Sequence, residues 1–418
     1  MKLITTTAIA LVAVAAAPPA EAQYGASAPQ QQTVPQASAQ AKPAQVQIKP
    51  SGKALKAIVD LQDTVKKNDF ANVPAKVAAA QAVASTKEDR YLIGKLQLDA
   101  ALAQKDNSAL AAAIDTIAGS GYLDSSKVAG LYKDLGATYY NNKQYAQAQA
   151  AYQKVLATDP RNVEVPALIG ESLFAQGQKA EAAAAFQRAI QARVAAGQKP
   201  DENLLKRATI IAYDAGSPIA AELGRQWVTS YPSPESWRNS IAIYRNLNHP
   251  DVEGTLDLLR LMQATSALTV SSDYSLFMRA SAEQSNYNEA QAVLDAGIAA
   301  KVVNPSDPEF RDIVAGLKTK NKATVADLET AEKTAQNPSA YMRIGDWYYA
   351  MGRYAKAAEL YRKAIGKPGV DSNIGNLHLG MALARAGDKP GATAALNAVS
   401  GSRADIAKFW LAYVNQRG

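Results

Sequence analysis

The sequence has no cysteine among its 418 residues. This absence excludes disulfide bonds, thiolate zinc sites, iron–sulfur clusters, a cysteine nucleophile and a lipidated N-terminal cysteine. Histidine is scarce as well, because the chain contains only His249 and His378, which lie far apart in the sequence. A metal site built from two or three histidines of one chain is therefore disfavoured. We predict that the protein binds no metal and no other cofactor.

Aromatic residues are also few, at 7% of the chain, although 48% of the residues are hydrophobic. Alanine supplies much of that hydrophobic fraction. Because alanine is the best helix former and a poor strand former, this composition favours closely packed helices over a β-sandwich. A chain of this length and hydrophobicity can bury a large core.

The net charge of +7 and the pI of about 9.2 are a mild basic excess, which is less than a nucleic-acid-binding stripe requires. We therefore predict no nucleic-acid partner. The excess is concentrated in residues 338–418, which contain 11 Lys or Arg and 5 Asp or Glu, whereas the other 337 residues have a net charge of +1. A solvated basic face is one interpretation. The other is an acidic partner: an anionic envelope polymer, a lipid headgroup surface or an acidic protein.

The first 22 residues have the layout of a secretory signal peptide. A charged start at Met1 and Lys2 precedes an apolar stretch over residues 3–17, and small residues at Ala20 and Ala22 precede a cleavage point ahead of Gln23. A membrane anchor is the alternative. However, the 15 residues of the apolar stretch span only about 22 Å as a helix, which is less than a hydrocarbon core of about 30 Å.

No other stretch reaches the roughly 18 uninterrupted apolar residues that a membrane-spanning helix needs. We therefore predict that the mature protein is not an integral membrane protein. Export of a chain without cysteine points to a Gram-negative periplasm, with secretion as the alternative.

Residues 23–50 are of low complexity, with eight Gln, six Ala and four Pro among 28 residues. This segment lacks the large apolar side chains that could offset the entropy of ordering. We predict that it is a disordered tether.

Two later segments match each other without gaps at an offset of 209 residues. Each has a glycine inside its first helical stretch, and a short polar turn joins that stretch to a second one. The shared positions are Tyr132, Gly136, Tyr139, Ala148 and Tyr152 in the first segment and Tyr341, Gly345, Tyr348, Ala357 and Tyr361 in the second. This pattern resembles the tetratricopeptide repeat, a helix-turn-helix unit of about 34 residues. The glycine allows the second helix to approach closely, and the tyrosines fill the space between the helices.

Weaker copies of the pattern extend in both directions and give about ten helix pairs. The resemblance implies an all-α fold, a tetratricopeptide-like α-solenoid in which each unit contacts only its neighbours. Phe409, Trp410 and Tyr413 form an apolar face on a last helix, which we expect to cap the final pair. The expected organisation is divergent helical pairs over 51–128, a repeat array over 129–400 and a capping helix over 401–418.

No catalytic motif is present: the sequence has no G-x-S-x-G, no phosphate-binding glycine loop and no H-E-x-x-H. His249 lies in an Asn-His-Pro turn, and His378 is expected to pack or to contact solvent. We therefore predict that the protein is not an enzyme.

The resemblance also implies that the first helix of each pair lines a concave groove that binds peptides. On that basis we expect five partner-binding residues to face this groove: Lys133, Tyr140, Met342, Asp346 and Tyr349. The alternative is that these residues line a groove used for other packing. The carboxylate clamp that some members use is not expected, because Ala137 and Leu168 stand where the clamp has asparagine.

The function that this sequence favours is a periplasmic scaffold for protein–protein interactions, in envelope biogenesis or export. One alternative is a binding accessory for an anionic envelope polymer such as an exopolysaccharide. Another is an enzyme that cleaves cell-wall glycan, for which the repeats leave no catalytic domain. Fold alone does not decide among them.

Overall fold

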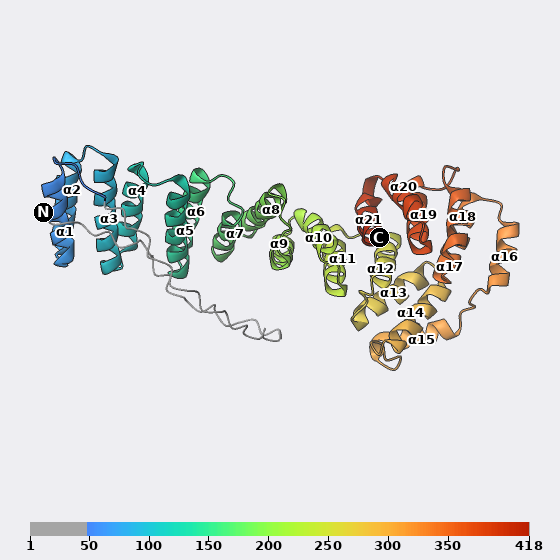
Figure 1. The fold of residues 1–418 in the computed structure, drawn as a ribbon. Helices are drawn as coiled ribbons and strands as arrows, with labels where there is room; N and C mark the ends of the chain where they lie inside the picture. The colour runs from blue at the N-terminus through green and yellow to red at the C-terminus, as the bar shows by residue number, and fades with distance from the viewer. Residues whose placement is uncertain (1–47, 418) are drawn as a thin grey trace, which may run out of the picture. The chain divides into compact units, whose positions relative to one another are not determined.

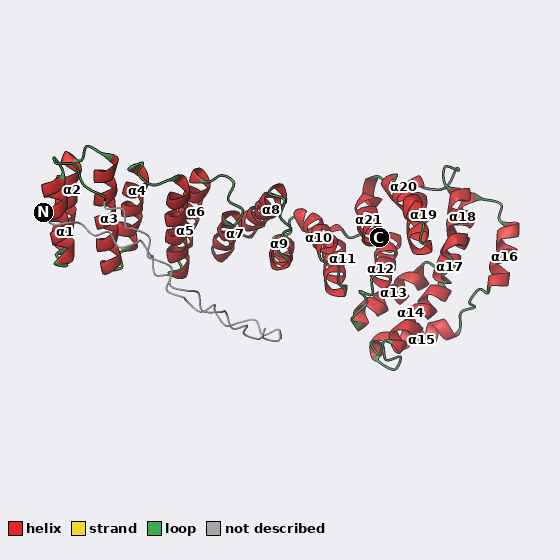
Figure 2. Cartoon of the chain, in the orientation of Figure 1, coloured by secondary structure: helices red, strands yellow, loops and turns green. Residues whose placement is uncertain are grey.

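A computed structural model describes residues 48–417 of the chain. The predicted signal peptide at 1–22 and most of the predicted tether at 23–50 lie outside the described residues. Within the described part every regular element is helical (Figure 2): it has 21 α-helices and two 3₁₀ turns, η1 (Phe70–Asn72) and η2 (Gly401–Arg403). The expected all-α fold is confirmed.

The chain divides into two compact units, Met1–Ala192 and Arg193–Gly418 (Figure 1). The described part of the first unit contains seven helices and most of an eighth: α1 (Leu55–Lys66), α2 (Val73–Val83), α3 (Lys87–Gln104), α4 (Asn107–Gly119), α5 (Ser125–Asn141), α6 (Tyr145–Thr158), α7 (Val165–Ala175) and α8 (Lys179–Ala195). Successive helices form antiparallel hairpins, of which α3–α4 and α5–α6 are the most closely packed.

The second unit contains the remaining helices. These are α9 (Glu202–Asp214), α10 (Ile219–Ser230), α11 (Pro234–Asn248), α12 (Val252–Ala264), α13 (Ser271–Glu283), α14 (Tyr287–Ala299), α15 (Pro308–Lys318), α16 (Val325–Thr334), α17 (Pro338–Ala350), α18 (Tyr354–Ala364), α19 (Ser372–Ala386), α20 (Lys389–Asn397) and α21 (Ala404–Gln416). Side-chain caps define many of the helix starts. Asn337, for example, accepts a hydrogen bond from the backbone N–H of Ala340, and Pro338 occupies the first turn of α17.

The repeat glycines lie where the sequence pattern predicts close helix contact. A Cβ atom built on Gly345 of α17 would lie 2.6 Å from Cε1 of Tyr361 on α18, and Gly136 of α5 faces Tyr152 of α6 in the same way. Each tyrosine ring therefore fills the space that its glycine leaves open.

Replacing Gly345 with alanine is expected to destabilise the α17–α18 hairpin by about 1–3 kcal/mol, because the new methyl group overpacks the Tyr361 ring. Gly316 of α15 is a matched control, since nothing lies within 4 Å of its Cβ position. Gly316→Ala should instead raise stability by up to about 1 kcal/mol through helix propensity. Thermal melts of the two variants should therefore shift in opposite directions. Equal shifts would show that Gly345 is not at a tight helix contact.

The second unit departs from the expected open solenoid, because α12 contacts helices far beyond its neighbours in sequence. Residues 256–262 of α12 are all buried, so the helix has no solvent-exposed face along this stretch. The indole N–H of Trp410 on α21 donates a hydrogen bond to the carbonyl of Asp257 at 3.2 Å, and Gln416 donates one to the carbonyl of Val228 on α10 at 2.7 Å. The expectation that each unit contacts only its neighbours is wrong for this half of the chain.

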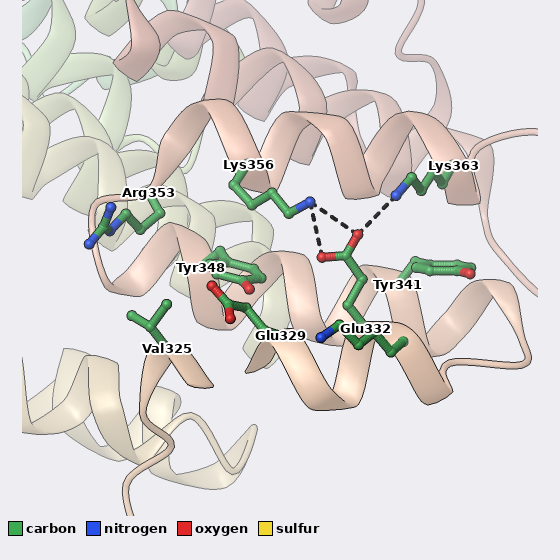
Figure 3. Close-up of a pocket in the computed structure, with 9 residues that line it drawn as sticks. Val325, Glu329, Glu332, Tyr341, Tyr348, Arg353, Lys356 and Lys363 are labelled. Carbon is green, nitrogen blue, oxygen red and sulfur yellow. Dashed lines mark hydrogen bonds and ion pairs between the residues drawn. The ribbon is translucent and has the colours of Figure 1, made fainter. Parts of the chain in front are cut away.

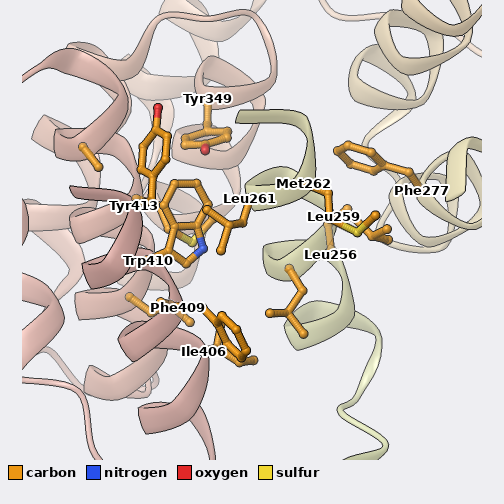
Figure 4. Packing of buried hydrophobic residues seen from close by; sticks show 14 of the residues in the cluster. Leu256, Leu259, Leu261, Met262, Phe277, Tyr349, Ile406, Phe409, Trp410 and Tyr413 are labelled. Carbon is orange, nitrogen blue, oxygen red and sulfur yellow. The ribbon is translucent and has the colours of Figure 1, made fainter. Parts of the chain in front are cut away.

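The apolar side chains of α12 explain this closure. Leucines and Met262 lie on both sides of the helix, and a helix with apolar side chains on both sides buries both of them. Figure 4 shows Phe277 of α13 beside one side of α12, while Ile406, Phe409 and Trp410 of α21 lie on the other. The last helix therefore covers α19 and α20 and also packs against α10 and α12, closing the second unit on itself.

Candidate partner-binding surfaces

Two of the five predicted groove residues lie on α5 in the first unit. Lys133 is partly exposed and forms an ion pair with Glu164, just before α7. Tyr140 is also partly exposed, and its ring meets that of Tyr145 edge to face, with centroids 5.3 Å apart. Both side chains are accessible enough to contact a partner, and their role in binding stays a prediction.

The other three predicted groove residues lie on α17, and the structure places them largely in the interior. Tyr349 is only 4% exposed, and the guanidinium of Arg260 on α12 lies 5.2 Å from its ring centroid. Asp346 accepts a hydrogen bond from the Tyr361 hydroxyl at 2.7 Å, and Met342 is partly buried against the core. An exposed groove position for Tyr349 is therefore wrong, because its ring is buried with the Arg260 guanidinium beside it. Tyr348 and Tyr349 are both buried, so neither tolerates truncation as an exposed residue would.

A buried polar network joins α12 to the helices around it. Arg260 donates two hydrogen bonds to Glu289 of α14, from Nε at 2.8 Å and from Nη2 at 2.9 Å, and its Nη1 lies 3.3 Å from Asp257. His378 of α19 is 2% exposed and lies between two carboxylates, with Nε2 3.2 Å from Asp257 and Nδ1 3.1 Å from Asp346. Four helices thus meet through charged pairs in the interior of the second unit.

The pKa directions agree with this geometry. Burial alone would lower the pKa of His378, but Asp257 and Asp346 together raise it well above its usual value. Burial alone would raise the pKa of Asp346, but His378, Arg260 and the Tyr361 hydroxyl hold it below its usual value. Glu253, 3.9 Å from His378, has a pKa that burial raises. These two directions favour a protonated His378 beside an ionised Asp346.

The sequence carries a signal for this network that the groove prediction did not use. Asp257 and Arg260 are three residues apart in the otherwise apolar stretch 256–262, so both are expected to be buried and to need partners. The expectation that His378 packs against other residues agrees with its burial. His249, in contrast, is a turn residue as expected, since it ends α11 in the left-handed conformation with φ of 44°.

A cleft of about 470 Å³ opens between α16 and the α17–α18 hairpin. Tyr341 and Tyr348 line it, and Glu332 of α16 accepts hydrogen bonds from Lys356 at 3.0 Å and Lys363 at 2.9 Å (Figure 3). Burial alone would raise the pKa of Glu332, but the two lysines lower it. These ion pairs hold α16, whose only buried residue is Leu328, against the hairpin.

The basic excess of residues 338–418 is partly neutralised by acidic residues from earlier in the chain. Lys356 and Lys363 pair with Glu332, and the Arg403 guanidinium donates to Asp251 at 2.7 Å and 2.8 Å. The local surplus of positive charge is thus smaller in the folded unit than in the sequence window, and an acidic partner stays a prediction.

Among residues 48–417 no cluster of three or more His, Cys, Asp or Glu side chains is placed to hold a metal ion. In the same part of the chain no helix combines the length and the hydrophobicity needed to cross a membrane.

Family models of the tetratricopeptide repeat match residues 133–198 and 338–365. The chain contains tetratricopeptide repeats. The first match covers most of α5 together with α6, α7 and α8, and the second covers α17 and α18, which include the two segments in which the sequence pattern is strongest. The resemblance inferred from the tyrosine and glycine spacing is confirmed, and proteins of this repeat class bind other proteins.

Solved structures of helical repeat proteins are also similar to this chain. A tetratricopeptide repeat protein from Parabacteroides merdae is 13% identical, covering 80% of this chain and 100% of its own, with a TM-score of 0.21. The C-terminal part of a repeat protein from Cytophaga hutchinsonii is 11% identical, covering 76% and 97%, with a TM-score of 0.24. A pentatricopeptide repeat protein from maize is 14% identical, covering 85% and 51%, with a TM-score of 0.27.

These similarities are too low to carry a functional argument. No curated protein sequence matches the chain significantly.

Proposed function

We propose that the protein is an exported, non-enzymatic scaffold that binds protein partners through its tetratricopeptide hairpins, in a periplasmic process such as envelope biogenesis or export. The observation that carries this proposal is the pair of repeat matches, since proteins built from this repeat present their first helices to partners. The partly exposed face of α5, with Lys133 and Tyr140, is the proposed contact surface. The exported location rests on the signal-peptide layout of residues 1–22 and on nothing else.

The test compares two lysines that lie on different helices but have similar exposure and similar ion pairs. Lys133 on α5 and Lys154 on α6 are each nearly half exposed, at 43% and 47%, and each forms an ion pair with an acidic residue of a neighbouring hairpin. Only Lys133 lies on a first helix. We expect Lys133→Gln and Tyr140→Ala to weaken crosslinked capture of a defined partner from intact envelopes, while Lys154→Gln retains it.

The outcome separates the candidate functions. Capture that persists in high salt and is lost in the α5 variants supports the scaffold. Equal capture by all variants would contradict the α5 surface. Recovery of a polysaccharide that high salt releases would favour the anionic-polymer alternative, because such binding is electrostatic. N-terminal sequencing tests the location, and a mature protein that began at Met1 would contradict cleavage before Gln23.

A further inference from the structure

A second cleft, of about 380 Å³, lies in the second unit between the ends of α12 and α17, with α14 and α19 at its sides. Tyr349, Gln263 and Arg385 contribute polar side chains to its lining, together with Glu289. It is separate from the cleft beside α16 and shares no lining residue with it.

The hydroxyl group of Tyr349 is the first unusual feature of this cleft. The oxygen is buried and has no hydrogen-bond partner among the described residues. A buried hydroxyl without a partner is uncommon, because the group loses its hydration and gains nothing in exchange. Burial raises the pKa of Tyr349 far above its usual value, so the group stays protonated and can donate a hydrogen bond.

Arg385 of α19 is the second unusual feature. Its guanidinium lies 4.7 Å from the ring centroid of Tyr354, and that ring meets Tyr349 edge to face at 5.0 Å. Arg385 is only partly exposed, yet within residues 48–417 no carboxylate forms an ion pair with it. The stacked tyrosine holds the guanidinium in place while its N–H donors remain available.

The carboxylate of Glu289 cannot serve as the missing partner. It already accepts two hydrogen bonds from Arg260 and one from the Asn286 amide at 3.1 Å. Gln263 is exposed and carries no charge. The cleft therefore presents a cation and a buried hydroxyl donor, and the acceptor that would satisfy both is missing.

We propose that this cleft binds a carboxylate. The two oxygens of a carboxylate accept the paired N–H groups of a guanidinium, and one of them can also accept the hydrogen of the Tyr349 hydroxyl. The proposal goes beyond partner binding by the repeats, because the carboxylate can be a free organic acid or an acidic side chain of a bound protein.

The test is a ligand-observed NMR titration of the mature protein with three probes. These are glutarate, a capped hexaglutamate peptide and a capped hexaglutamine peptide of the same length. We expect the two carboxylate probes to bind and hexaglutamine not to bind. Binding of hexaglutamate without glutarate would assign the site to acidic side chains of a partner protein. Binding of both probes would show that the site also accepts free organic acids. Failure of both carboxylate probes to bind would overturn the proposal.

Two variants and a control locate the binding. Arg385→Gln should weaken the affinity for the carboxylate probes about tenfold or more, since a charge-assisted pair is lost. Tyr349→Phe should weaken it severalfold while the melting temperature holds or rises, because the removed hydroxyl had no partner. Arg362→Gln changes an exposed arginine of α18 outside the cleft and should leave affinity unchanged.

If Arg362→Gln lost as much affinity for the carboxylate probes as Arg385→Gln, the probes would be binding to positive surface charge in general, and the proposal would fail. It would also fail if Arg385→Gln and Tyr349→Phe bound as wild type does. Partner capture by the α5 variants is measured separately, so a failure of either proposal leaves the other intact.

Discussion

Replacing Trp410 with alanine is expected to lower the free energy of unfolding of the second unit by about 3–5 kcal/mol, as truncation of a large core aromatic does. Trp410 is 0% exposed, and its indole N–H is bonded to the carbonyl of Asp257 on the central helix α12. The truncation removes the packing of the ring and the side-chain hydrogen bond to that carbonyl. Urea denaturation followed by circular dichroism measures the loss.

Asn415→Ala is the control for this substitution. Asn415 is exposed on the same helix, so its truncation removes no core packing and should change the stability only slightly. Hydrogen exchange should show the loss of protection in Trp410→Ala spread to α12, because α21 covers one side of that helix. If protection fell only in α20 and α21, the last helix would be a simple cap and the second unit would not be held closed by it.

The sequence predicted the hairpins well because their signals are local. The glycine of a first helix and the tyrosine of the following helix lie 16 residues apart in both strong copies, and this pairing recurs in the structure as a direct contact. The apolar face with Phe409, Trp410 and Tyr413 likewise indicated a buried last helix, and all three side chains are buried. In each case the spacing of residues close together in the sequence was enough to predict which side chains are buried.

The closure of the second unit depends on contacts between residues about 150 positions apart, which no repeat pattern encodes. Arg403 pairs with Asp251, and Trp410 bonds to Asp257, across that separation. The prediction that Tyr349 faces an open groove was wrong for the same reason, because the residues that bury it lie far away in the sequence. A solenoid leaves the inner face of a first helix open, whereas here Arg260 of α12 reaches the ring of Tyr349 on α17. The leucines and Met262 on both sides of α12 were the available warning.

The second large effect is expected from His378→Gln, which removes the cation between the buried Asp257 and the partly buried Asp346. Breaking a buried charged pair by removing one partner typically costs about 3–5 kcal/mol, because the remaining charge is left uncompensated. The groups that face His378 are Asp257 and Glu253 of α12, Asp346 of α17 and the ring of Tyr361, which lies 5.5 Å away between centroids. Urea denaturation at pH 6 should show the loss.

The pH dependence gives this prediction its sharper form. A folded-state pKa raised above the unfolded value of about 6.5 means that protonated His378 stabilises fully below pH 6.5. That stabilisation is lost as the pH rises through the folded pKa. The lowered pKa of Asp346 works in the other direction, since its contribution is present above about pH 4 and is lost in stronger acid.

The gap in stability between wild type and His378→Gln should therefore be widest between about pH 4 and pH 6.5, and it should narrow at alkaline pH. The double variant Asp257→Asn, His378→Gln should recover part of the loss, because it removes one of the two carboxylates that faced the lost cation. A gap that stays constant from pH 6 to pH 10 would mean that His378 is neutral in the folded protein and stabilises α12, α17 and α19 by packing alone.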